Sequence, residues 1–260
     1  MPFPYKTVLI TGATSGIGHA LAERMIDVGI FVVAVGRNQE RLSELQKKHG
    51  SDKVAVERLD ISNLTILPGW SKKMITTYPT IDCIFLNAGF QHVVDFTNPS
   101  SIALDRIDSE VATNYLSSIH LITHFLPHLL SRRPEPSGIV LVSSSLSIVP
   151  MPQVANYCAT KAAMHSLAWS LRAQLANSGA SNMRVVEVLP PAVKTELHMR
   201  QGRGQIGMEL GEYIDDTWEQ LTSSEEIPEC HPPTSRTHGG NGLAAMEDSK
   251  KRVFAATWLR

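Results

Sequence analysis

Short apolar runs alternate with amphipathic segments along the first three quarters of the chain. Each run is rich in Val, Ile and Leu, and runs of this length without polar alternation are typical of strands buried in a parallel sheet. The predicted strands span residues 6–11, 30–35, 54–59, 81–86, 138–142 and 183–189.

The segments between these strands carry apolar residues at helical spacing. Helices are predicted from the glycine cluster at 12–18 to Val28, with Gly29 as its cap, and then over 39–49, 62–78, 102–131 (in one or two pieces) and the stretch after Pro152. Strands that alternate with helices indicate βαβ units with right-handed crossovers and helices on both faces. We therefore predict an α/β fold: a doubly wound, Rossmann-type parallel sheet in a single domain.

The last quarter of the chain is less regular. Residues 195–222 mix helical and loop signals, and residues 228–242 are rich in Pro and Gly, which predicts a mobile loop. The stretch 252–258 fits either a strand or a helix. No linker divides residues 1–195.

Composition narrows the class of protein. The 260 residues carry a net charge of -1, which gives no reason to expect nucleic acid or an anionic membrane as partner. No apolar run is long enough to span a bilayer, and the first residues lack the zones of a signal peptide.

Cysteines and histidines suggest neither disulfides nor a metal. Cys83, Cys158 and Cys230 are odd in number and widely separated, which favours a reducing, cytoplasmic location. His198, His231 and His238 lack the spacing of metal ligands, so we predict no metal site.

A glycine-rich loop joins the first predicted strand to the first helix. In this context Gly12 permits a tight turn, Gly16 lets the backbone approach a diphosphate, and Gly18 lets the helix pack closely. A diphosphate would meet free N–H groups at the positive end of the helix. The spacing departs from the generic G-x-G-x-x-G pattern, and the alternative is a purely structural turn. The predicted nucleotide-binding residues of the loop are Gly12, Thr14, Ser15, Gly16, Ile17 and Gly18.

The end of the second predicted strand bears on cofactor choice. NAD-binding proteins usually place an acidic residue there for the 2′-hydroxyl. This chain has Gly36 followed by Arg37, and a guanidinium without a carboxylate favours a 2′-phosphate. We therefore predict NADP(H) over NAD(H). The alternative is that Arg37 pairs with Glu40 or Glu44 on the next helix.

Tyr157 and Lys161 lie one helical turn apart, so their side chains share a face. A phenol has a pKa of about 10, and a nearby ammonium group lowers it. The pair could then exchange a proton with an alcohol or a carbonyl. The alternative is an ordinary i, i+4 pair on a solvated helix.

These motifs together resemble those of the short-chain dehydrogenase/reductase family, over roughly residues 5–195. The residues that carry the resemblance are the glycine loop, Asn87-Ala88-Gly89, Asn114, Ser144, Tyr157-x-x-x-Lys161 and Pro190-Pro191-x-Val193-x-Thr195. The stretches 156–163 and 189–198 are similar to the DltE-like oxidoreductases of that family.

The resemblance implies roles for the central residues. Tyr157 would be the general acid in carbonyl reduction and the base in the reverse direction. Lys161 would lower the pKa of Tyr157 and hydrogen-bond the nicotinamide ribose. Ser144 would hold the substrate oxygen, with Ser143 and Ser145 as alternatives.

Further roles follow from the same resemblance. Asn114 would hold a water in a proton relay from Lys161, or else kink its helix; the two are compatible. Asn87, Ala88 and Gly89 would contact the adenosine ribose. Asp60 would contact adenine, and its alternative role is the N-cap of a helix starting near residue 62.

The loop after the sixth strand departs from the family pattern. Pro190-Pro191 replaces the usual Pro-Gly and stiffens the chain, because proline fixes φ and lacks an N–H. The main chain of Val193 and the hydroxyl of Thr195 would still reach the carboxamide of the nicotinamide.

The resemblance implies an oxidoreductase that transfers a hydride between NADP(H) and a carbonyl or secondary alcohol. Residues 1–195 would form the dinucleotide-binding and catalytic core, and residues 196–260 a substrate-loop segment and tail of the same domain. Leu146, Val149 and Met151 suggest a pocket wall for a small to medium apolar substrate. The family also implies a homodimer or homotetramer. The alternatives are a nucleotide-binding sensor or scaffold, and a non-redox biosynthetic step.

Overall fold

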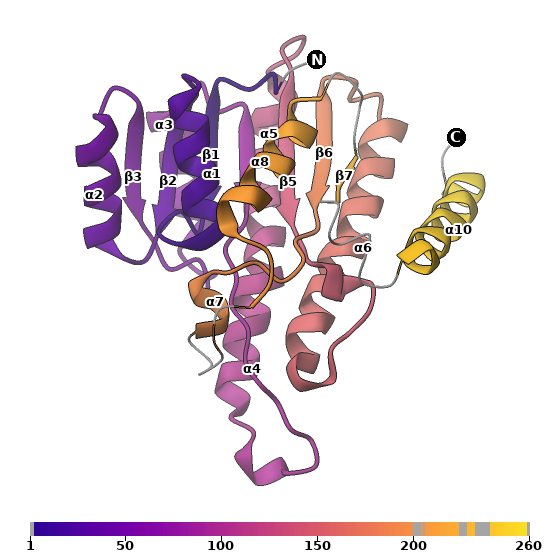
Figure 1. Cartoon of the computed structure of the whole chain (residues 1–260). Helices are drawn as coiled ribbons and strands as arrows, with labels where there is room; N and C mark the ends of the chain where they lie inside the picture. Colours follow the sequence, from indigo (N-terminus) through magenta and orange to yellow (C-terminus); the bar gives the residue numbers. More distant parts are fainter. Residues whose placement is uncertain (1–2, 200–203, 205, 224–227, 232–239, 259–260) are drawn as a thin grey trace.

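Seven parallel strands form one sheet in the order β3-β2-β1-β4-β5-β6-β7. The computed structural model (Figure 1) describes residues 3–199, 204, 206–223, 228–231 and 240–258. The strands are β1 (Thr7–Thr11), β2 (Phe31–Gly36), β3 (Val54–Arg58), β4 (Cys83–Leu86), β5 (Ser137–Val142), β6 (Met183–Val188) and β7 (Glu229–Cys230). The strand order reverses between β1 and β4, as in a doubly wound sheet, so the predicted Rossmann-type fold is confirmed.

Helices cover both faces of this sheet (Figure 1). They are α1 (Gly16–Asp27), α2 (Gln39–His49), α3 (Leu67–Thr77), α4 (Leu104–Val111), α5 (Ser117–Ser131), α6 (Ala155–Asn177), α7 (Glu196–Met199), α8 (Leu210–Leu221) and α10 (Gly240–Trp258). Side chains of α1, α2 and α8 share one buried cluster, and those of α3, α5 and α6 share another.

The two clusters follow from the pleat of the strands. All five residues of β1 are buried, with Val8 and Ile10 in the cluster of α1 and Leu9 in the cluster of α5. Because successive side chains of a strand point to opposite faces, a continuous apolar run serves both layers.

Two helices differ from their predicted extents. The helix predicted from residue 62 begins at Leu67, with Pro68 in its first turn, where its fixed φ suits the helix and its missing N–H costs nothing. Residues 62–65 form turns instead. The predicted helix 102–131 contains a π-helical segment, Ala112–Leu116, between α4 and α5.

The C-terminal quarter is more ordered than predicted. Within the predicted loop 228–242, β7 pairs with β6 through Glu187–Glu229 and Val188–Cys230, while residues 232–239 lie outside the described residues. A two-residue strand is too short to produce a periodic pattern. The stretch 252–258 is helical, and the ring of Phe254 in α10 lies 5.4 Å from that of Trp169 in α6. No helix in the described part of the chain is long and apolar enough to cross a membrane.

Candidate active site

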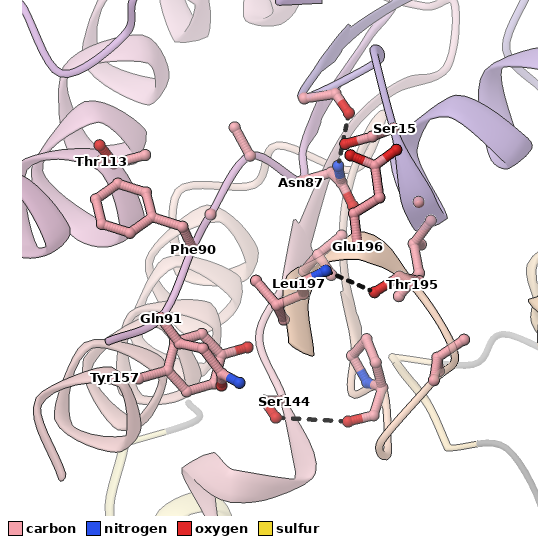
Figure 2. Close-up of a pocket in the computed structure, with 18 of the residues that line it drawn as sticks. Ser15, Asn87, Phe90, Gln91, Thr113, Ser144, Tyr157, Thr195, Glu196 and Leu197 are labelled. Atoms are coloured by element: carbon pink, nitrogen blue, oxygen red, sulfur yellow. Dashed lines mark hydrogen bonds between the residues drawn. The ribbon is translucent and has the colours of Figure 1, made fainter. Parts of the chain in front are cut away.

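The carboxyl ends of the central strands open into a cavity of about 350 Å³ (Figure 2). This is where parallel α/β sheets bind ligands, because the chain leaves in opposite directions on either side of the point where the strand order reverses. Of the predicted site residues, all but Gly18 and Asn114 line the cavity: Gly12, Thr14, Ser15, Gly16, Ile17, Arg37, Asp60, Asn87, Ala88, Gly89, Ser144, Tyr157, Lys161, Pro190, Val193 and Thr195.

The glycine loop adopts backbone conformations that favour glycine. Gly12 has a φ of +73° and Gly16 a φ of +56°. A Cβ atom on Gly18 would lie 2.2 Å from Nδ2 of Asn87 and 2.5 Å from the carbonyl oxygen of Gly12. These three glycines therefore let α1 start close against the ends of β1 and β4.

Asn87 fastens the ends of β1 and β4 together. Its Nδ2 donates to the carbonyl oxygen of Thr11 at 3.1 Å, and its backbone N–H donates to the hydroxyl of Thr11 at 3.1 Å. The backbone N–H of Ala88 donates to the same hydroxyl at 3.2 Å. The loop above these contacts is thus held rigidly beside the cavity.

The N-terminus of α1 suits a diphosphate. Among the described residues, the first turn of α1 has no acidic side chain, and the N-cap Ser15 makes no capping hydrogen bond with its side chain. The first N–H groups of the helix therefore face the cavity edge with their partial positive charge uncompensated. This cradle, together with Gly12 and Gly16, fits a dinucleotide.

The end of β2 has no room for a side chain at position 36. A Cβ atom on Gly36 would lie 2.5 Å from Cγ2 of Thr14. The next residue, Arg37, lies with its Nη1 atom 3.8 Å from Oδ2 of Asp60, so it pairs with neither Glu40 nor Glu44. The side chain of Arg37 is 58% exposed at the rim of the cavity, where an anion can reach it.

Asp60 is held by the turn that follows it. Its Oδ1 atom accepts hydrogen bonds from the backbone N–H of Ser62 at 3.0 Å and from the Ser62 hydroxyl at 2.7 Å. Burial acts to raise the pKa of Asp60, but these bonds and the charge of Arg37 outweigh it, so that the pKa is lowered. Since α3 begins only at Leu67, the alternative role of Asp60 as a helix N-cap is wrong.

Tyr157 and Lys161 lie in the first two turns of α6, and both are buried. The Nζ atom of Lys161 lies 5.6 Å from the centre of the Tyr157 ring and donates a hydrogen bond to the carbonyl oxygen of Val142 at 2.8 Å. Burial lowers the pKa of Lys161 to about 8, against the opposing charges of Glu187 and Glu110.

The expected lowering of the Tyr157 pKa by Lys161 is not the net result among the chain's own groups. Burial raises the pKa of Tyr157, and its hydrogen bond with Ser144 offsets only part of this effect. A fully desolvated phenolate is costly, and this cost exceeds the gain from neighbours. Tyr157 therefore keeps its proton at neutral pH.

The three consecutive serines after β5 are differently engaged. Ser144 lies opposite Tyr157 (Figure 2) and donates to the carbonyl oxygen of Pro190 at 3.5 Å, while its hydroxyl accepts from the N–H of Leu146 at 3.2 Å. The hydroxyl of Ser143 is bound to Glu187. The backbone N–H of Ser145 also donates to Pro190, at 2.9 Å.

Asn114 lies within the π-helical segment, outside the cavity wall. Its Oδ1 atom accepts from the N–H of Phe90 at 3.0 Å, and its Nδ2 atom donates to the carbonyl oxygen of Phe90 at 2.9 Å and to the hydroxyl of Thr160 at 3.1 Å. The expected break in the helix is present, and such π turns often lie at functional sites. A water relay through Asn114 stays a prediction.

The loop after β6 closes the cavity on the side of the glycine loop. Val193 pairs with Met208, whose N–H donates to the carbonyl oxygen of Ala192 at 2.9 Å. The hydroxyl of Thr195 accepts from the N–H of Leu197 at 3.3 Å (Figure 2). The side chain of Thr195 lies 3.3 Å from where a Cβ atom on Gly16 would be, so it is next to the glycine loop.

Several lining residues were not named individually from the sequence, the last three of them in the predicted substrate-loop segment: Phe90, Gln91, Thr113, Glu196, Leu197 and Ile206. Phe90, Gln91 and Ile206 come from loops, Glu196 and Leu197 from the short helix α7, and Thr113 from the π-helical segment. Leu146 and Met151 line the cavity as expected, whereas Val149 is 49% exposed and does not. Met208 and Trp218 pack against the core, and His238, one of the histidines named above, lies outside the described residues.

Comparisons with known proteins agree with this geometry. Residues 6–205 match the short chain dehydrogenase family. The chain is 33% identical over 218 residues to the uncharacterized oxidoreductase DltE of Bacillus subtilis, which covers 82% of this chain and 83% of that protein.

Solved structures show the same fold. A short-chain dehydrogenase from Sphingobium yanoikuyae in complex with NADPH superposes with a TM-score of 0.79 at 25% identity, covering 96% of this chain and 95% of that one. A 3-ketoacyl-(acyl-carrier-protein) reductase from Brucella melitensis complexed with NADH gives a TM-score of 0.74 at 24% identity, covering 86% and 94%. From its motifs, its strand order and these matches, the chain belongs to the short-chain dehydrogenase/reductase family, in its group of DltE-like oxidoreductases.

Proposed function

We propose that this oxidoreductase interconverts a carbonyl group and a secondary alcohol with NADP(H) as its cofactor. The observation that carries the proposal is the meeting of Ser144, Tyr157 and Lys161 at the wall of a cavity whose other end is the glycine loop. A proton donor, a hydrogen-bonding hydroxyl and a buried cation beside a dinucleotide cradle are the groups that reduction of a carbonyl needs.

Different residues around the cavity would bind different parts of the cofactor. Gly12 to Gly18 and the start of α1 would hold the diphosphate, and Asn87 to Gly89 and Asp60 the adenosine. Val193 and Thr195 would hold the carboxamide, and Lys161 the nicotinamide ribose. When bound, the nicotinamide supplies or accepts a hydride.

The protonation states favour reduction at neutral pH. Because burial raises the pKa of Tyr157, the phenol keeps a proton that it can give to the oxygen of a carbonyl substrate. Ser144 would hold that same oxygen within reach of the phenol. Lys161, with its pKa lowered to about 8, is still mostly charged at pH 7 and would stabilise the phenolate that Tyr157 becomes.

The preference for NADP(H) rests on the end of β2. The fold itself accepts either cofactor, as the two bound neighbours show for themselves. In this chain Thr14 leaves no room for an acidic side chain at position 36, and the exposed guanidinium of Arg37 can meet a phosphate. Titration of the protein fluorescence with each cofactor tests this, and equal affinity for NADH and NADPH would refute it.

The walls of the cavity favour an apolar substrate. Leu146, Met151, Leu197 and Ile206 are apolar residues of its lining. We propose a small to medium ketone or aldehyde as substrate. A cytoplasmic location, consistent with three buried free cysteines, and a homodimer or homotetramer remain part of the proposal.

Replacement of the phenol tests the chemistry directly. Tyr157→Phe should abolish NADPH oxidation with a panel of carbonyl compounds while leaving NADPH affinity within about twofold. Tyr78→Phe, which removes a partly buried phenol away from the cavity, is the matched control and should keep full turnover. Retained turnover in Tyr157→Phe would disprove the role of the phenol. Tight NADPH binding by the wild type without turnover on any carbonyl would favour a nucleotide sensor instead.

A further inference from the structure

The face of α6 that carries the catalytic pair continues as a polar stripe toward its C-terminus. Tyr157, Lys161, His165 and Trp169 recur every four residues, so their side chains lie on one side of the helix. His165 is buried, and the ring of Trp169 lies 5.1 Å from it. The last strands of the sheet place two carboxylates, Glu187 and Glu229, against this stripe.

Glu187 is a fully buried carboxylate in the middle of the protein. Its Oε2 atom lies 2.9 Å from Nδ1 of His165, and its Oε1 atom accepts a hydrogen bond from the hydroxyl of Ser143. A buried carboxylate is strongly destabilising unless it is paired and hydrogen-bonded. The core therefore provides Glu187 with specific partners, although the reaction described above does not use this carboxylate.

Glu187 acts on the catalytic residues in two ways, by a hydrogen bond through Ser143 and by its charge. Through Ser143 it holds the end of β5, where the next residue is Ser144; the N–H of Ser143 also donates to the carbonyl oxygen of Val188 at 2.9 Å. Through space its charge raises the pKa of Lys161 against the effect of burial. Lys161 lies one helical turn before His165 on the same side of α6, and His165 contacts Glu187 at 2.9 Å.

The other charges around this cluster are accounted for. Glu110 on α4 acts on Lys161 with the same sign as Glu187. Arg172 on α6 lies 3.9 Å from Glu229, and its charge also acts on Glu187. Glu229, the neighbour of Glu187 on β7, has its own cation in Lys251, whose Nζ lies 2.6 Å from it. Among the described residues, Glu187 and Glu110 are thus the two carboxylates whose charges act on Lys161.

We propose that Glu187 is a positioning residue of the active site, which supplies a buried counter-charge to Lys161 and, through Ser143, anchors the strand end that carries Ser144. This inference rests on the proposed reductase function. It extends the site from the cavity wall into the core, one turn further along α6 than the Tyr-Lys motif.

Glu187→Gln tests the counter-charge. The amide has the same shape and can still accept the hydrogen bond of Ser143, but it carries no charge. Without this charge Lys161 loses its proton at a lower pH, so the alkaline limb of the kcat–pH profile should move down by about one pH unit. Glu187→Asp, which keeps the charge, should leave the limb where the wild type has it. Glu57→Gln, the same change on β3 beside Lys73, is the control and should shift nothing.

The second variant tests the anchor without altering the charge. Ser143→Ala removes the hydroxyl bound to Glu187, and it should raise the KM for the carbonyl substrate several-fold with the alkaline limb unmoved. This variant still tests the anchoring role of Glu187 if Glu187→Gln does not fold. An unshifted limb in folded Glu187→Gln, or an unchanged KM in Ser143→Ala, would overturn the corresponding half of the inference. A wild type without carbonyl turnover would instead overturn the proposed function.

Discussion

An added methyl group at Gly18 should destabilise the protein, whereas the same change at Gly69 should stabilise it. Both glycines are the third residue of a helix, α1 and α3 respectively. A Cβ atom on Gly18 would lie 2.2 Å from Nδ2 of Asn87 and 2.5 Å from the carbonyl oxygen of Gly12, whereas nothing lies within 4 Å of a Cβ atom on Gly69.

The two substitutions should change the free energy of unfolding in opposite directions. Ala is favoured over Gly within a helix by about 0.5–1 kcal/mol, which is the full effect expected for Gly69→Ala. At Gly18 the same gain is opposed by overpacking, which costs about 1–3 kcal/mol. Displacement of Asn87 also weakens its hydrogen bond to Thr11, worth about 1 kcal/mol. We therefore expect Gly18→Ala to be less stable than the wild type by about 1–3 kcal/mol.

Urea unfolding followed by circular dichroism measures both changes, with an unchanged m-value as the check that the same transition is compared. Gly18→Ala should also weaken NADPH binding, because the loop that faces the diphosphate must move with α1. If Gly18→Ala were as stable as Gly69→Ala and bound NADPH like the wild type, the close packing of α1 on Asn87 would be refuted.

Three further predictions follow from individual residues. Arg37→Asp should weaken NADPH binding by about ten- to a hundredfold without weakening NADH binding, because a charge-assisted hydrogen bond to the 2′-phosphate is worth about 1.5–3 kcal/mol. Equal losses for both cofactors in a fluorescence titration would contradict this prediction. Gly207→Ala should raise the Kd for NADPH several-fold. Gly207 has a φ of +106° and its Cβ would lie 2.0 Å from the Ala192 oxygen, so the change should displace the loop that carries Val193. Wild-type affinity of this variant would disprove the prediction. Burial acts to raise the pKa of Glu229, but hydrogen bonds led by that of His231 lower it to about 2, so this carboxyl contributes stability that is complete above about pH 5 and lost as the pH falls toward 2. Glu229→Gln should therefore show a shallower fall of Tm over this range, and an equally steep fall would count against the pairing.

The carboxyl-end site was largely predictable because its residues follow strands directly. The glycine loop, Asn87 and Asp60 each come after an apolar run, and parallel strands bring such positions to one edge of the sheet. Lining residues such as Glu196 and Ile206 come from a short helix and a loop, so no periodicity points to them.

The pKa values of Tyr157 and Lys161 depend on how deeply each group is buried, and the local sequence does not reveal this. The i, i+4 spacing predicted a shared face for Tyr157 and Lys161, but the effect of Lys161 on the phenol depends on how far each group is removed from water. In the folded protein desolvation dominates at both groups, raising the pKa of one and lowering that of the other.

The amino-acid sequence by itself determined the α/β architecture, the glycine cradle and the spacing of Tyr157 and Lys161, because these depend on short-range periodicity and on residues adjacent in the chain. Only the tertiary structure decided that Glu187 lies against His165, on the side of α6 that also carries Lys161. Glu187 and His165 lie 22 residues apart in the sequence, and neither belongs to a motif. They meet because a helix and a strand pack face to face, and a buried carboxylate needs the hydrogen-bonding partners that this packing brings to it.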